Sequence, residues 1–250
     1  MIEVKNLFAS YEKKPVFTKL NFTLNDNSFT ALCGKNGSGK STLLSLMAGI
    51  VPSGLKYSGD ILINGKSVFK MKRTEAAHNL SFLLQSENPV WNLTVRQFVE
   101  TGLYSFNQLS KSQIDSAVNE ALKTIGIFDF AEKFIFNISG GEFQKCRLAR
   151  ALVQKTPFMI FDEPADQLDL PFQLQFLREI KKLNKTILFS IHDVNTASLF
   201  ADDYLLLIGE SILHGNREQI FTENFLSKAF LSPVKIYKHP LENVPQALFF

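Results

Sequence analysis

Residues 34–42 read Gly-Lys-Asn-Gly-Ser-Gly-Lys-Ser-Thr and constrain the fold of this chain more than any other stretch. The apolar residues 29–33 favour a strand before this loop, and residues 43–48 favour a helix after it. Strand, glycine-rich loop and helix in this order form a phosphate-binding loop, or P-loop. Its glycines let backbone N–H groups face an anion, and the helix N-terminus adds roughly half a positive charge. The sequence therefore predicts that the chain binds a nucleoside triphosphate.

Two side chains of the P-loop have predicted roles of their own. Lys40 can reach the β- and γ-phosphates, and the Ser41 hydroxyl is a predicted ligand of Mg²⁺. A glycine-rich turn that binds nothing is the alternative, but the spacing, the Lys-Ser pair and the flanking elements favour the P-loop. The predicted nucleotide contacts in this stretch are Asn36, Gly37, Ser38, Gly39, Lys40, Ser41 and Thr42.

The composition is that of an ordinary globular protein. At 250 residues, the chain can form one large domain or a domain with a subdomain. Its 27 basic and 24 acidic residues give a net charge of +3, too balanced to argue for a nucleic-acid partner. Residues 1–5 lack the apolar run that is typical of a signal peptide, and no apolar run approaches the ~18 residues of a membrane span. Cys33 and Cys146 have no paired spacing, so we expect buried thiols in a soluble, cytoplasmic protein.

The N-terminal residues alternate apolar and polar side chains, which is typical of antiparallel strands. We expect short strands at 2–4, 16–17 and 20–24. Residues 60–68 predict a hairpin in the same small sheet, with Asn64-Gly65 as its two-residue turn. Tyr11 stands between the first two predicted strands, where simple packing is the commoner role of a single tyrosine.

Three later apolar runs each end in polar residues. Residues 80–84 precede Gln85, residues 158–161 precede Asp162 and Glu163, and residues 186–191 precede His192. Such runs, and the run at 204–208, alternate with helical patterns and predict a parallel sheet covered on both faces. Ligands of open α/β sheets bind at the carboxyl ends of the strands. These four polar residues are therefore expected to converge on the P-loop.

Asp162-Glu163 after an apolar strand is a Walker B pattern. The aspartate is expected to hold Mg²⁺ through water, and the glutamate to polarise an attacking water. An acidic pair at a strand end is more often a cap or a solvated turn, but a P-loop in the same chain favours the functional interpretation.

Residues 94–101, 110–125 and 128–133 have helical spacing, and Thr94 precedes Gln97 at the distance of a capping box. We interpret about 88–137 as an inserted helical subdomain. The predicted fold class is α/β: a P-loop NTPase parallel-sheet core with a small antiparallel β subdomain and this helical insertion.

Ser139, Gly140, Gly141 and Glu142 are predicted to start another helix. Ser139 and Glu142 have capping-box spacing, and the two glycines expose N–H groups that suit a second phosphate site.

Taken together and in order, these motifs resemble those of ABC-type ATPase subunits over almost the whole chain, 1–250. Residues 138–142 correspond to the family's signature, Gln85 to its Q-loop, 165–169 to its D-loop and His192 to its switch histidine. The resemblance implies that Tyr11 stacks on adenine. Ile138 replaces the usual leucine, and Phe143 and Cys146 also depart from the family's usual residues.

The resemblance implies ATP and Mg²⁺ as cofactors, and a head-to-tail dimer in which each ATP lies between the P-loop of one chain and the signature of the other. The residues it implies for catalysis are Glu163, His192 and Gln85; for Mg²⁺, Ser41, Gln85 and Asp162; and for further nucleotide contacts, Tyr11, Ser139, Gly140, Gly141 and Asp169.

Residues 168–174, 192–197 and 213–221 resemble importer ATPases for iron chelates, haem and cobalamin. An importer subunit would be peripheral on the inner face of the cell membrane, with separate permease subunits and, indirectly, a solute-binding protein. The resemblance implies that 88–104 docks on the permease, although Trp91 and Leu93 could instead pack the helical subdomain. The alternative function is that of a soluble ABC ATPase of iron–sulfur cluster assembly.

Overall fold

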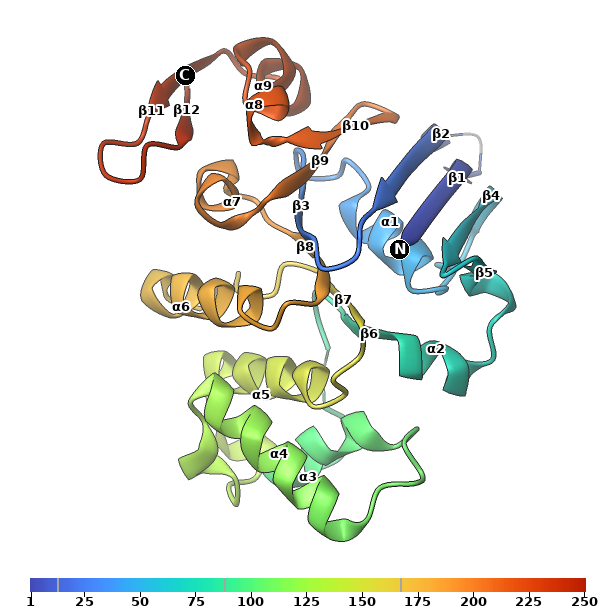
Figure 1. The fold of residues 1–250 in the computed structure, drawn as a ribbon, viewed down its shortest axis with the longest axis vertical. Helices are drawn as coiled ribbons and strands as arrows, with labels where there is room; N and C mark the ends of the chain where they lie inside the picture. The colour runs from blue at the N-terminus through green and yellow to red at the C-terminus, as the bar shows by residue number, and fades with distance from the viewer. Residues whose placement is uncertain (13, 88, 167) are drawn as a thin grey trace. The chain divides into compact units, whose positions relative to one another are not determined.

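The computed structural model of the chain describes residues 1–12, 14–87, 89–166 and 168–250 (Figure 1). Within these residues the chain divides into two units. Unit 1 comprises Met1–Met71 and Asn184–Phe250, and so contains both ends of the chain. Unit 2 is the intervening segment Lys72–Leu183, which includes the predicted helical insertion.

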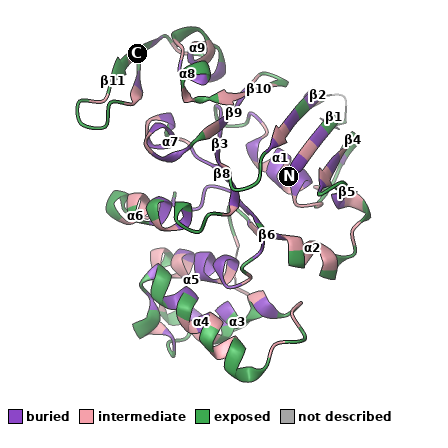
Figure 2. Cartoon of the chain, in the orientation of Figure 1, coloured by how far each residue is buried: buried purple, intermediate pink, exposed green. Residues whose placement is uncertain are grey.

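Parallel strands form the core of unit 1. Strand β3 (Phe29–Cys33) lies between β8 (Thr186–Ser190) and β9 (Asp203–Ile208) and pairs in parallel with both. Every residue of β3 and β8 is buried, as Figure 2 shows in purple. Strands covered on both faces need apolar side chains at nearly every position, which explains their continuous apolar runs. The prediction of parallel strands is confirmed in this unit.

Unit 1 also contains an antiparallel sheet in the order β2–β1–β4–β5. The predicted short strands at 2–4, 16–17 and 20–24 are wrong in length, because they are parts of two long strands, β1 (Ile2–Tyr11) and β2 (Lys14–Leu24). The register of β1 shifts near Asn6, whose φ is 48°. Such a bulge interrupts the alternation from which strand length is inferred.

The predicted hairpin turn is confirmed. Asn64 and Gly65 have φ values of 51° and 79° and connect β4 (Leu55–Ile63) to β5 (Lys66–Ser67). Two consecutive positive φ values match the twist of a tight hairpin, and asparagine and glycine tolerate them best.

Unit 2 pairs β6 (Leu80–Leu83) in parallel with β7 (Phe158–Phe161). Helices α3 (Val95–Glu100) and α4 (Lys111–Ile125) pack against α5 (Gly140–Leu152), as Figure 1 shows. Capping boxes begin all three helices, at Thr94, Ser110 and Ser139, and those at Thr94 and Ser139 were predicted.

The predicted helix at 128–133 is wrong. Only a short 3-10 turn, η3 (Phe128–Phe130), forms there among the described residues. The carbonyls of Ala131 and Lys133 accept hydrogen bonds from Arg96 N and Val95 N, both at 2.9 Å. These carbonyls therefore satisfy the first N–H groups of α3, which an α-helix leaves without partners of its own.

The sequence did not predict how the C-terminal residues fold. Asn195 in α7 (Val194–Phe200) donates to Ala247 O at 3.0 Å and accepts from Ala247 N at 2.7 Å, which holds a C-terminal hairpin in unit 1. In the part of the chain that the structure describes, no helix has the length and apolar character needed to cross a bilayer. The remaining elements are α1 (Lys40–Met47), η1 (Val68–Lys70), α2 (Arg73–Asn79), η2 (Thr101–Leu103), η4 (Ile135–Asn137), α6 (Leu170–Lys181), β10 (Ser211–Asn216), α8 (Arg217–Ile220), α9 (Glu223–Phe230), β11 (Val234–Lys238) and β12 (Pro245–Phe249).

We expect Ser110→Ala to lower the free energy of unfolding by about 1 kcal/mol, because it removes the side chain that caps α4. Ser116→Ala on the exposed face of α4 is the matched control and should be neutral or slightly stabilising, since alanine favours helices. Urea titration followed by circular dichroism measures both. Equal losses in the two variants would contradict the capping role.

Candidate functional site

The P-loop of unit 1 folds around its own lysine. Lys40, the first residue of α1, is 5% exposed, and its Nζ donates to Gly34 O at 3.0 Å and Lys35 O at 3.4 Å. A Cβ on Gly39 would lie 2.7 Å from Val16 Cγ1, so this position has room only for glycine. The N–H groups of the first turn of α1 have no partners within the helix. Ammonium and N–H groups therefore offer donors to an anion from one short segment.

A buried hydroxyl in this loop has no hydrogen-bond partner among the described residues. The Ser38 hydroxyl oxygen is buried and makes no hydrogen bond within the described residues. A buried hydroxyl is costly without a partner, so such an atom in a native loop calls for a ligand or water. This observation fits a loop that closes on bound phosphate.

His192 lies at the same edge of the unit 1 sheet as the P-loop. Strands β3 and β8 are parallel neighbours, and Ile191 N donates to Leu32 O at 3.3 Å. His192 therefore follows β8 where the P-loop follows β3. The Asp193 carboxylate caps α7 by accepting from Asn195 N and Thr196 N, which fixes the chain just after His192.

Unit 2 brings Gln85 and the acidic pair together. Asp162 N donates to Leu83 O at 2.9 Å, which continues the pairing of β6 with β7. Asp162 and Glu163 are 2% and 6% exposed. Gln85 Nε2 donates to Glu163 Oε2 at 2.5 Å, so these two residues lie in direct contact. These residues are also predicted to converge on the P-loop. Because the P-loop belongs to unit 1, this part stays a prediction.

The backbone of Glu163 is unusual. Its φ is +49°, in the left-handed region that costs a non-glycine residue free energy. Such conformations persist only where the surrounding contacts hold them, and they cluster at functional sites. The strain fits the predicted role of Glu163 as the group that polarises water.

The signature residues form the predicted capping box at the start of α5. The Glu142 carboxylate accepts from Ser139 N at 2.7 Å and from Ser139 Oγ at 2.8 Å. The bond from Ser139 N is the main cause that lowers the pKa of Glu142. A Cβ on Gly140 would meet no described atom within 4 Å beyond its chain neighbours and its own helix, and Gly140 is exposed, so this helix start lies on an open surface.

Tyr11 and Asp169 are the remaining predicted nucleotide contacts. Tyr11 is the last residue of β1, not a residue between two strands, and it is 38% exposed. Asp169 caps α6, because its Oδ1 accepts from Phe172 N at 2.9 Å. Two residues of predicted functional segments, Gln167 in the D-loop and Asn88 in the docking segment, lie outside the described residues.

The positions that depart from the family pattern serve packing in unit 2. The Phe143 ring lies 5.3 Å from the ring of Phe98 in α3, measured between centroids. Cys146 is 1% exposed, and burial raises its pKa to about 12. Both cysteines of the chain are free and buried, as predicted.

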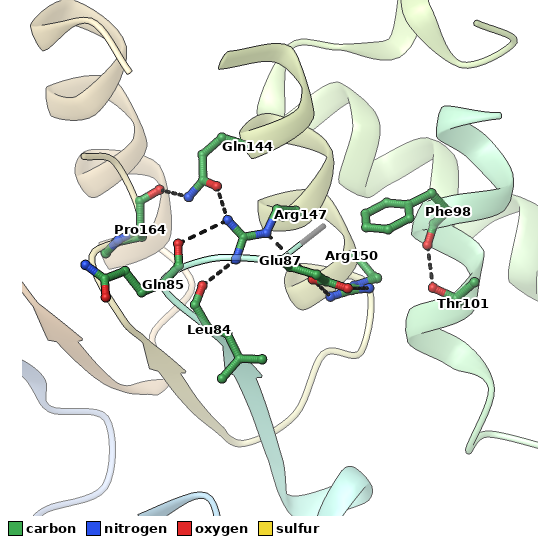
Figure 3. A network of polar contacts seen from close by, with 9 residues as sticks. All are labelled: Leu84, Gln85, Glu87, Phe98, Thr101, Gln144, Arg147, Arg150 and Pro164. Atoms are coloured by element: carbon green, nitrogen blue, oxygen red, sulfur yellow. Dashed lines mark hydrogen bonds and ion pairs between the residues drawn. The ribbon is translucent and has the colours of Figure 1, made fainter. Parts of the chain in front are cut away.

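Helix α5 carries a row of polar side chains that was not predicted from the sequence. Gln144, Arg147 and Arg150 recur every third residue and so line one side of the helix (Figure 3). Arg147 and Arg150 contact the segment that carries Gln85, and Gln144 contacts Arg147. The available signal was the recurrence of long polar side chains at every third position of the helix.

A family profile described as ABC transporter matches residues 17–166, which include the P-loop, Gln85, the signature residues and the acidic pair. The chain belongs to the ABC transporter family. Its catalytic activity follows from the family: the chain is an ABC-type ATPase.

Curated ABC relatives are similar along their whole length. The petrobactin import ATP-binding protein YclP of Bacillus subtilis is 30% identical, with 92% of each chain covered. The hemin import ATP-binding protein HmuV of Idiomarina loihiensis is 32% identical, with 96% of this chain and 94% of the relative covered. The iron(3+)-hydroxamate import ATP-binding protein FhuC of Bacillus subtilis is 31% identical, with 100% of this chain and 94% of the relative covered.

Solved ABC structures share the fold. An inward-facing ABC transporter described as of the metal-chelate type has a TM-score of 0.83 at 26% identity, with 100% of this chain and 97% of that chain covered. An ATP-binding cassette in a dimeric post-hydrolysis state with ADP and phosphate has a TM-score of 0.77 at 24% identity, with 86% and 98% covered.

We expect Lys40→Ala to weaken ATP binding roughly 10- to 100-fold, because a hydrogen bond from a charged group contributes about 1.5–3 kcal/mol. Titration with a fluorescent ATP analogue measures the dissociation constant. Lys56→Ala, at an exposed position of β4, is the control and should bind as the parent chain does. An unchanged dissociation constant for Lys40→Ala would mean that the P-loop assignment is wrong.

Glu163→Gln should lower the rate of ATP hydrolysis by ~10²–10⁴-fold while ATP binding survives, because the amide cannot accept a proton from water. Phosphate release and nucleotide titration separate the two effects. The control Glu120→Gln replaces an exposed carboxylate of α4 and should hydrolyse ATP normally. Near-normal turnover by Glu163→Gln would refute the assigned role.

Proposed function

We propose that this ABC ATPase is the ATP-binding subunit of an importer that takes up an iron chelate or haem through separate membrane subunits. The observation that carries the proposal is the similarity, over nearly the full length, to import ATP-binding proteins for petrobactin, hemin and iron(3+)-hydroxamate. In this role the chain would be peripheral on the inner face of the cell membrane. A cobalamin-type solute is a further possibility that rests on the sequence resemblance alone.

We assign the chemistry of hydrolysis to residues of both units. Lys40 and the N–H groups that begin α1 bind the phosphates, and Tyr11 stacks on the base. Hydroxyl, amide and carboxylate oxygens are the donors that Mg²⁺ prefers, and Ser41, Gln85 and Asp162 supply this set. Mg²⁺ would neutralise charge on the phosphates. Glu163 accepts a proton from the attacking water, and His192 contacts the γ-phosphate.

We further propose that two copies pair head to tail. The open helix start at Ser139, Gly140 and Gly141 then covers an ATP held by the P-loop of the other copy, and Asp169 lies near the same nucleotide. The support within this chain is that Gly140 has space for a ligand on its exposed side. ATP joins the two copies because neither half-site surrounds the phosphate alone, and hydrolysis releases them.

The segment after Gln85 is the proposed docking surface for the membrane subunits. Val90 and Trp91 are 81% and 73% exposed, which argues against the alternative that Trp91 packs the helical subdomain. Leu93 is half-buried, so packing accounts for part of its role. These residues and Pro89 border a cavity of about 170 Å³, which also reaches Phe98 and Arg150. Exposed apolar side chains around a cavity suit a partner's helix.

An iron–sulfur assembly ATPase remains the contrasting function. None of the relatives described above is named as one, and an exposed tryptophan beside a cavity has no assigned use in that function. The two functions differ in their partner, because an importer subunit must associate with membrane chains.

Trp91→Asp should uncouple the ATPase from its membrane subunits, while ATP binding by the purified chain stays unchanged. Association with detergent-solubilised permease should fall at least ~10-fold, the size of a typical hot-spot loss. Solute-stimulated hydrolysis should fall by a similar factor. Co-purification and the ATPase rate of the reconstituted complex measure this. The control Leu241→Asp charges another residue that is 87% exposed and should leave both properties intact.

The solute class is tested in the same reconstituted complex. A binding protein loaded with an iron chelate or haem should stimulate hydrolysis. Stimulation by a sugar, amino acid or oxyanion in its place would exclude this class, and the absence of any membrane partner would favour the iron–sulfur function.

A further inference from the structure

Arg147 is a buried guanidinium in unit 2 with an unusual set of partners. Its side chain is 3% exposed. Nη2 donates to Leu84 O at 2.5 Å, and Nη1 donates to Gln85 O at 3.4 Å and to Gln144 Oε1. Nε lies 3.6 Å from Glu87 Oε2. Figure 3 shows these contacts converging on one guanidinium: Leu84, Gln85 and Glu87 come from the segment that follows β6, and Gln144 comes from α5 itself.

The two carbonyls that Arg147 holds flank one residue. Leu84 O belongs to the peptide group before Gln85 and Gln85 O to the peptide group after it. Holding both peptide planes restricts the two backbone dihedrals of Gln85 and therefore the direction of its side chain. Gln85 itself is exposed and so is not fixed by burial. Its contact with Glu163 at 2.5 Å thus depends on a backbone that Arg147 orients.

The same network also reaches Glu163, the other partner in the contact with Gln85. Gln144, 2% exposed, accepts from Arg147 and donates from Nε2 to Pro164 O at 2.7 Å. Pro164 directly follows Glu163, whose left-handed backbone needs support from its surroundings. Arg147 therefore holds the Gln85 side directly and the Glu163 side through Gln144.

The charges explain why this position needs arginine. Burial lowers the pKa of Arg147, and Glu87 opposes that effect. Glu87 also forms a two-bond ion pair with Arg150, so one carboxylate serves two guanidinium groups. The carbonyls of Leu84 and Gln85 accept hydrogen bonds from the two terminal nitrogens and offset part of the cost of burying the charge. A planar guanidinium can donate to several acceptors at once, whereas a lysine ammonium is a point charge.

We propose that Arg147 is a positioning residue for ATP hydrolysis, which sets the geometry of Gln85 relative to Glu163 without touching the nucleotide. This inference rests on the roles proposed above for Gln85 and Glu163. It does not depend on the solute or on the membrane partner.

A double-mutant cycle on the purified full-length chain tests the inference. The variants are Arg147→Met, Gln85→Ala and the double variant, assayed for kcat, for the KM of ATP and for the urea midpoint of unfolding. If Arg147 acts through the Gln85 side chain, its loss should lower kcat on the order of tenfold in the parent chain, because small misplacements of reacting groups are costly. In the Gln85→Ala background the same change should cost less than about twofold.

A merely structural role predicts a different result. General damage to unit 2 would lower kcat by the same factor in both backgrounds, and that additive outcome would overturn the inference. The KM of ATP should stay within about twofold of the parent value if the damage is confined to positioning. If Gln85→Ala alone hydrolyses ATP normally, the premise about Gln85 fails, and the inference fails with it.

Two further variants keep the test decisive. Arg147→Lys retains the charge and serves in the same cycle if Arg147→Met does not fold; it should restore kcat only in part, since a single ammonium cannot hold both carbonyls. Arg217→Met is the matched control, because Arg217 also donates to a main-chain carbonyl, Ala201 O at 3.1 Å, but belongs to unit 1. It should shift the unfolding midpoint without lowering kcat.

Discussion

Parallel pairing of neighbouring strands is the constraint on which the functional residues depend. In unit 1, the pairing of β3 with β8 makes the P-loop and His192 begin at one edge of the sheet. In unit 2, the pairing of β6 with β7 does the same for Gln85 and the Asp162-Glu163 pair. Parallel strands run through apolar surroundings. The first position that tolerates a polar side chain therefore lies just past the end of the strand. In each unit, the predicted functional residues therefore lie just past the ends of the strands.

Unit 2 holds several buried charged and polar groups. Its interior holds Arg147, Gln144, Asp162 and Glu163, each with less than a tenth of its surface exposed. Such groups are tolerable only when their hydrogen bonds are satisfied, and removal of one partner leaves another without compensation. The consequence is that the hydrogen bonds of this network depend on one another, so the loss of one weakens the rest. Selection for a stable fold and selection for a defined Gln85–Glu163 contact act on the same atoms.

Local signals in the sequence predicted a large part of this architecture. Strand β7 has the predicted bounds 158–161, and the Asn64-Gly65 turn and the Ser139 capping box depend on residues close in sequence. The errors arise where distant groups decide the outcome. The segment 128–133 gives two carbonyls to α3, and the main-chain acceptors of Arg147 lie more than sixty residues away in sequence. No periodicity within a short window encodes such pairings.

The two cysteines give each unit an internal reporter. Cys33 ends the strand before the P-loop, and Cys146 lies on α5. Both side chains are buried, and burial raises the pKa of each thiol to about 12. The thiolate is the nucleophile that attacks an alkylating reagent, so neither side chain reacts while its surroundings stay closed. The rate at which each thiol becomes labelled thus measures the opening of one unit at a time. Nucleotide should slow labelling of Cys33 through the loop that follows it, without any engineered probe.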